Sequence, residues 1–246
     1  MKSYQVAIKN ELYKLIHRRK TKWLIGIILG LSVIGIIGIF IIQNLTSTHV
    51  VNASELATWL LQQMDGLILP LFVTMMTIDL FTGELGNETI KNTLLMPINR
   101  SRVYLAKITT VAIAIVGILL GMFIVNVTVG TIFFGVSSMT GQLLATFLAY
   151  LLTSIPLILI SILAAMIGLS FKSSSSALTF SIVLYVALKT VGLFVAKLSI
   201  FMPTSYMEWY RYPLTSNTST QMLLFMVAYI IMFISLGILR FDTKEI

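Results

Sequence analysis

The sequence predicts an all-α integral membrane protein with six transmembrane helices. It also predicts an interfacial amphipathic helix at the N-terminus and both termini in the cytoplasm. Hydrophobic residues make up 57% of the 246 residues and charged residues only 11%, whereas a soluble domain carries about 25% charged residues. Lys and Arg also gather in a few segments between long apolar runs, and such segments orient a polytopic protein.

Six apolar runs are each long enough to cross a hydrocarbon core of about 30 Å at about 1.5 Å per residue. The third run is longer than one crossing needs, so we expect it to tilt or to leave the bilayer at its ends. The first run follows a long basic segment and has no small-residue cleavage site, which indicates a span rather than a cleaved signal. The six runs cover roughly residues 23–43, 59–81, 104–134, 142–169, 176–196 and 220–239.

The distribution of basic residues fixes the orientation. With the N-terminus inside, the cytoplasmic segments are 1–22, 82–107, 170–175 and 240–246, and they hold 14 of the 17 Lys and Arg residues. This asymmetry places the basic side in the cytoplasm. We assign the net charge of +8 to orientation and to contact with anionic membrane lipid, and expect no nucleic-acid partner.

Motifs for catalysis and for cofactor binding are missing from the sequence. There is no cysteine, and the dipeptide Gly-Lys never occurs, so a phosphate-binding loop of the GxxxxGK[ST] type is excluded. The two histidines, His17 and His49, fall on opposite sides of the membrane, and neither HExxH nor GxSxG occurs. We therefore expect no enzyme activity, no metal site and no cofactor on this chain.

The first 22 residues form a separate element. Apolar residues recur there with helical spacing, while basic residues occupy the other face, so we expect a short helix lying in the interface with its cationic groups reaching water and phosphate. A disordered basic tail is the alternative. The apolar face consists of Tyr4, Ile8, Leu12, Leu15 and Ile16.

Residues 197–219 are aromatic and hold two prolines but few charges. This composition suits an extracellular segment in the outer interface, with short broken helices that dip in and out as a re-entrant segment does. Tyr206, Trp209 and Tyr210 are the candidate outer-rim aromatic residues over a translocation path. An ordinary aromatic belt explains the same residues equally well.

Two ionisable residues, Asp65 and Lys189, fall at membrane depth. A charge there costs about 2.5–3.5 kcal/mol on insertion scales, so each should face protein or water. Similar depth suggests that the two form an intramembrane polar pair, and the alternative is that each snorkels independently. An ion-coupled carrier usually needs buried carboxylates near the midplane, and Asp79 and Glu84 lie too close to the cytoplasmic edge for that role.

Residues 82–103 form a polar segment between the second and third spans. Its characteristic residues are Glu84, Thr89, Ile90, Lys91, Leu94, Leu95, Pro97 and Arg100. With these residues, and with Tyr104 and Lys107 after them, the segment resembles the cytoplasmic coupling segment of ABC-2-type ABC transporter permeases. Many members have Gly where this chain has Glu88, which leaves the local path of the loop open.

The N-terminal helix supports the same resemblance, because Glu11, Lys14, Arg18 and Arg19 resemble the elbow helix of that family. The resemblance implies that residues 1–246 form one ABC-2-type transmembrane domain in a bacterial plasma membrane. It also implies two copies of a separate cytosolic ABC ATPase that hold ATP and Mg²⁺. A second permease copy or a paralogue would complete the assembly.

The residue spacing of the coupling segment, apart from the resemblance, also suggests how this segment could bind a partner. A short helix that begins near Thr89 presents Ile90 and Leu94 as i, i+4 neighbours, and this apolar ridge fits a groove on a separate ATPase subunit. Lys91 and Arg100 would flank the ridge. The alternative is that the ridge packs against the membrane ends of neighbouring spans.

The expected function is therefore that of a permease subunit in an ATP-driven exporter. The resemblance suggests amphipathic, antimicrobial or toxic peptides as cargo, as in bacitracin-resistance and lantibiotic-immunity exporters, or other hydrophobic compounds. Two alternatives stay open: a stand-alone immunity or sensor protein that binds a peptide at its outer face, and an ion-coupled secondary transporter.

Overall fold

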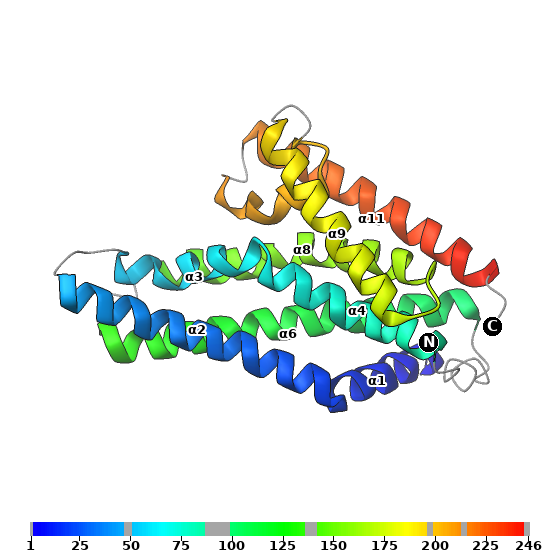
Figure 1. Ribbon diagram of the computed structural model, residues 1–246, viewed down its shortest axis with the longest axis horizontal. Coiled ribbons are helices and arrows are strands. Elements are labelled where there is room, and N and C mark those ends of the chain that lie inside the picture. Colours follow the sequence, from blue (N-terminus) through cyan, green and yellow to red (C-terminus); the bar gives the residue numbers. More distant parts are fainter. Residues whose placement is uncertain are drawn as a thin grey trace.

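A computed structural model describes residues 2–46, 51–86, 99–135, 142–195, 199–212 and 216–243. All regular elements in these ranges are helical, arranged as an elongated bundle (Figure 1). In chain order they are α1 (Lys2–His17), α2 (Arg19–Thr46), the 3₁₀ helix η1 (Ala53–Glu55), α3 (Leu56–Asp65), α4 (Ile68–Gly86), α6 (Arg100–Phe134), α8 (Leu143–Gly168), α9 (Ser174–Phe194), the 3₁₀ helix η3 (Pro203–Arg211) and α11 (Asn217–Thr243).

The predicted fold class is confirmed. Within the described ranges, α2, α6, α8, α9 and α11 are each long and apolar enough to cross a membrane, and α3 with α4 makes a sixth crossing if the bent pair is one span. The two termini lie at the same end of the bundle (Figure 1). At that end Arg240 donates to the Ser170 hydroxyl, and Arg100 donates to the Asp242 carbonyl at 3.4 Å. By the charge distribution this is the cytoplasmic end, and we call the opposite end the outer end.

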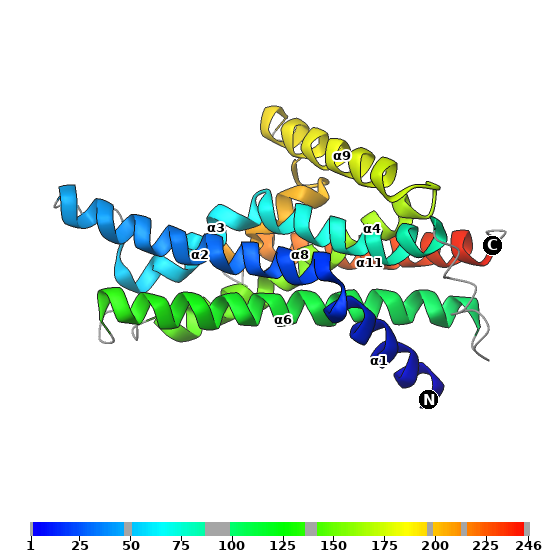
Figure 2. The same cartoon turned by 60° about the horizontal axis from the view of Figure 1, so that its bottom comes forward.

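Helix α8 lies at the centre of the bundle and packs against α4, α6 and α11. It carries no charged residue, and small or hydroxyl-bearing side chains such as Thr153, Ser161 and Ala165 are fully buried along it. Small side chains let neighbouring helices approach closely in a membrane. Helix α2 packs along α6, whereas α9 leans away from the bundle and contacts mainly α4 and η3 (Figure 2).

The second predicted span, 59–81, is not one continuous helix. The chain bends by 55° between α3 and α4. Pro70 has no N–H to donate to the carbonyl four residues earlier, and that carbonyl belongs to Gly66. The freed oxygen is satisfied from α9, by the Tyr185 hydroxyl at 3.0 Å and by the Lys189 ammonium. A freed backbone group at membrane depth needs such a partner, and these two donors therefore stabilise the break.

Pro156, in the middle of α8, likewise leaves the Leu152 carbonyl without its helical N–H donor. The Leu152 carbonyl, four residues before the proline, accepts a hydrogen bond from the indole N–H of Trp209 at 3.0 Å. Trp209 is 1% exposed and belongs to η3. The two prolines within the spans therefore create two acceptors, and these acceptors attach α9 and η3 to the rest of the bundle.

The N-terminal segment is helical, as its spacing predicts, but its buried face is rotated from the predicted one. Ala7, Glu11 and Leu15 are buried, whereas Ile16 is 48% exposed. The helix packs across α6. Tyr4 and the Ile8 carbonyl lie 3.4 and 3.5 Å from the hydroxyls of Thr109 and Thr110. Glu11 thus faces the bundle.

Candidate functional site

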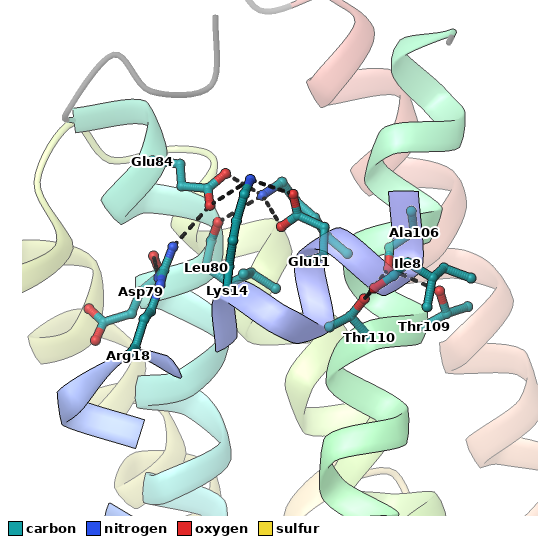
Figure 3. A network of polar contacts seen from close by, with 11 residues as sticks. Ile8, Glu11, Lys14, Arg18, Asp79, Leu80, Glu84, Ala106, Thr109 and Thr110 are labelled. Atoms are coloured by element: carbon teal, nitrogen blue, oxygen red, sulfur yellow. Dashed lines mark hydrogen bonds and ion pairs between the residues drawn. The ribbon is translucent and has the colours of Figure 1, made fainter. Parts of the chain in front are cut away.

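Five charged side chains from α1, α4, α6 and the junction of α1 with α2 meet at the cytoplasmic end (Figure 3). We call this group the Lys107 cluster; it consists of Lys107 on α6, Glu11 and Lys14 on α1, Arg18 between α1 and α2, and Glu84 on α4. Lys107 lies two turns into α6, and Glu84 lies in the last turn of α4. The cluster therefore joins three elements that are far apart in the sequence.

Lys107 is the centre of the cluster and is 0% exposed. Its ammonium group lies 2.5 Å from Glu84 Oε2 and 3.0 Å from Glu11 Oε2, and it donates to the Leu80 carbonyl at 3.2 Å. These acceptors use its three N–H groups. A buried ammonium flanked by two carboxylates is a geometry in which Coulomb attraction can offset the loss of hydration.

The second oxygen of each carboxylate faces a cation closer to water. Lys14 lies 2.7 Å from Glu11 Oε1 and 3.6 Å from Glu84 Oε1. Arg18 lies 2.9 Å from Glu84 Oε1 and also donates to the Asp79 carbonyl at 2.8 Å. Both carboxylates are therefore bridged between an inner and an outer cation, which locks the ends of α1, α4 and α6 together.

The cluster affects the titration of Glu11. Burial raises the pKa of its carboxyl, but Lys107 and Lys14 lower it more, so the pKa falls below the ordinary value of 4.5. A carboxyl with a lowered folded-state pKa stabilises the fold above its unfolded-state pKa, and this stability is lost as the pH falls through the folded-state pKa.

We therefore expect Glu11→Gln to flatten the acid dependence of stability below about pH 4.5. The measurement is the thermal midpoint of the purified protein as a function of pH. Glu208→Gln is the control, because the Glu208 side chain is 51% exposed and its one ion pair within the described ranges is with a partly exposed Arg211 at 2.8 Å. The same acid slope in Glu11→Gln and the wild type would contradict the assignment.

The cluster flanks the segment for which an ATPase-docking role is predicted. Glu84 precedes residues 87–98, and Lys107 follows them on α6. Arg100 is exposed at the start of α6, where it contacts the end of α11. Thr89, Ile90, Lys91, Leu94, Leu95 and Pro97 lie outside the described residues. Among the predicted elbow residues, Glu11, Lys14 and Arg18 join the cluster, whereas Arg19 is exposed.

Asp65 and Lys189 both lie at the break at Gly66, but their side chains bind different partners. Lys189 donates to the Gly66 carbonyl, and Asp65 Oδ2 accepts from the Tyr210 hydroxyl at 3.0 Å. No ion pair joins the two in the described part of the chain. Lys189 instead binds the backbone carbonyl of the residue that follows Asp65, and similar depth in the sequence did not indicate this contact.

The three predicted rim aromatics do not share one environment. Tyr206 and Trp209 are buried, and the Tyr206 hydroxyl donates to the Ile200 carbonyl at 2.5 Å. Tyr210 is half-buried. Burial and the neighbouring Asp65 raise the pKa of the Tyr210 hydroxyl, which keeps it protonated as a donor. The segment thus anchors the outer end through η3, while Phe201 and Tyr212 remain exposed.

Sequence reasoning missed two features of these sites. The prolines at positions 70 and 156 were the available signal for the freed carbonyls, since each lies inside an apolar run. Glu11 and Lys107 were identified separately through the resemblance. Their convergence depends on how α1 crosses α6, and no local pattern encodes that crossing.

Comparison with known proteins supports the resemblance. The family model described as ABC-2 family transporter protein matches residues 7–188. An uncharacterized protein of Bacillus subtilis (strain 168), YhcI, is 29% identical over 164 residues, which cover 57% of this chain and 49% of the relative. The matched region thus spans about half the length of that relative. Residues 7–188 contain α2 through most of α9 and the whole Lys107 cluster. The chain belongs to the ABC-2 family of transporter proteins and is a multi-pass membrane permease.

Proposed function

We propose that the chain is the membrane subunit of an ATP-driven exporter that moves amphipathic peptides or other hydrophobic compounds outward. ABC-2 permeases generally pair with ABC ATPase subunits, which fits a chain whose own sequence has no phosphate-binding loop. In this proposal two copies of a cytosolic ATPase bind residues 82–103, and a second permease copy or a paralogue completes the translocation path.

The observation that carries this proposal is the Lys107 cluster. The cluster binds together the two helices that flank residues 87–98 and also ties both to the N-terminal helix. A partner that pushes on residues 87–98 therefore acts on α1, α4 and α6 as one unit rather than on a free loop. Such a rigid junction is what coupling between ATP hydrolysis and span movement requires.

The test is co-purification of a cytosolic ATPase with the detergent-solubilised chain from its native membrane. We expect the wild type to retain an ATPase and Ile90→Asp/Leu94→Asp to lose it, because two charges would replace the apolar ridge. The matched control is Asn87→Asp/Asn92→Asp, which adds the same charge to the same segment and leaves the ridge intact. Thermal stability of each variant shows that binding, not folding, was changed.

Two outcomes count against the proposal. Retention of the ATPase by both double variants would remove the docking role from this ridge. Absence of any ATPase from the wild-type sample in mild detergent would favour the stand-alone immunity or sensor protein. The bent span with buried Asp65 is the one observation that favours an ion-coupled carrier, and Asp65→Asn should stop transport only in that case.

A further inference from the structure

A cavity of about 340 Å³ lies at the outer end of the bundle. It is bounded by η1 and α3 on one side, by the first turns of α8 on another, and by the end of η3. Its volume falls within the range of about 300–1,000 Å³ that small-molecule sites occupy. Its main polar and aromatic lining residues are Glu55, Trp59, Gln62, Gln142, Tyr210 and Arg211.

The charges around the cavity do not balance. Arg211, the one cation among the described lining residues, is paired with Glu208 at 2.8 Å. Glu55 forms no ion pair within the described part of the chain, and its side chain is exposed. Counting Glu208 with its partner Arg211, the described residues around the cavity hold two carboxylates and one guanidinium, beside two aromatic rings, Trp59 and Tyr210. This combination of groups favours a cation.

A second carboxylate lies behind the Tyr210 wall. Asp65 is 0% exposed; its Oδ2 accepts from Tyr210, and its Oδ1 has no hydrogen-bond partner among the residues that the structure describes. The nearby Lys189 donates to the Gly66 carbonyl instead of to Asp65. The hydroxyl dipole of Tyr210 is thus oriented by a buried acid, which fixes the ring that bounds the cavity.

We propose that this cavity binds an organic cation, the ammonium or guanidinium group of a basic side chain or of an aminolipid headgroup. Glu55 is its counter-ion, Trp59 and Tyr210 supply ring faces, and Gln62 and Gln142 offer amide oxygens. The inference deepens the proposed function, on which its meaning for transport rests, because a basic amphipathic peptide would present such a group at the outer face. Binding itself needs no ATPase.

The test uses the full chain in dodecyl maltoside, a detergent without charge or amine. Titration calorimetry compares N-acetyl-Leu-Lys-Leu-amide with the peptide that has uncharged norleucine in place of lysine. We expect the lysine peptide to bind at least about tenfold more tightly, and Glu55→Gln to remove most of that difference. Trp59→Leu should weaken binding as well.

Asp242→Asn is the matched control, because it removes one exposed carboxylate at the cytoplasmic end and should leave binding unchanged. Equal affinity for the two peptides, or wild-type affinity in Glu55→Gln, would overturn the proposal. Phosphatidylethanolamine added to the micelles distinguishes the sources of the cation: competition identifies the lipid headgroup, and unchanged peptide binding identifies a peptide side chain. A wild-type protein that co-purifies with the ATPase but does not bind the lysine peptide would overturn this inference and leave the proposed permease function standing.

Discussion

Lys107→Met should lower the stability of the protein by about 3–5 kcal/mol, the range for breaking a buried ion pair from one side. The substitution keeps the apolar length of the side chain but leaves Glu11 and Glu84 facing each other without their shared cation. Both carboxylates are almost fully buried, so water cannot replace the lost charge. The measurement is the unfolding free energy of the purified chain in detergent, or its thermal midpoint.

A double variant separates charge from packing. In Lys107→Met/Glu84→Gln the inner cation and one carboxylate are removed together, while Glu11 keeps Lys14 at 2.7 Å. We expect the double variant to recover at least about half of the loss. Lys20→Met serves as the control, since Lys20 is 70% exposed and lies 3.6 Å from Asp79, where a pair contributes about 0–1 kcal/mol. Equal losses in Lys107→Met and Lys20→Met would show that the cluster does not stabilise the fold.

Gly237→Ala should disrupt the packing of α11 on α6. A Cβ at position 237 would lie 2.0 Å from the Tyr104 hydroxyl and 2.5 Å from Cζ of its ring. Tyr104 is 0% exposed and is flanked by the rings of Phe81 and Phe241, with centroids 5.5 and 5.9 Å away, so the ring has no space to retreat. Overpacking of this kind costs about 1–3 kcal/mol or more, and the thermal midpoint should fall accordingly.

The comparison variant is Gly121→Ala on α6. A Cβ at Gly121 would meet nothing within 4 Å, so this substitution should be neutral or slightly stabilising. Tyr104→Phe should relieve Gly237→Ala only in part, because the ring carbon stays 2.5 Å away. Tyr104→Leu should relieve it further. A Gly237→Ala protein as stable as Gly121→Ala would mean that α11 can shift freely on α6.

The two ends of the bundle are held by different interactions. At the cytoplasmic end, ionic contacts around Lys107 join α1, α4 and α6. At the outer end, the carbonyls freed by Pro70 and Pro156 bind donors from α9 and η3. The first end lies beside the segment predicted to receive the ATPase. The second borders the cavity at the outer face, and α8 runs from that side of the bundle to the cytoplasmic end.

Hydropathy and the Lys and Arg count predicted the number, order and orientation of the spans. Hydropathy did not predict that the run 59–81 is bent between α3 and α4. A hydropathy window measures transfer of side chains and does not record which backbone carbonyl loses its donor. The prolines at 70 and 156 marked both places, but the identity of the replacement donors required distant residues such as Lys189 and Trp209.

The sequence by itself determined that this chain is a multi-pass membrane protein and predicted its basic end to be cytoplasmic, because those properties follow from the transfer free energy and charge of each segment. Only the tertiary structure decided which charges meet. Glu11 and Lys107 are 96 positions apart, and their 3.0 Å contact exists because α1 turns a face containing a carboxylate toward α6. The same holds for Asp65, whose partner is Tyr210 of η3 rather than Lys189, because the bend at Gly66 gives the Lys189 ammonium a backbone oxygen instead.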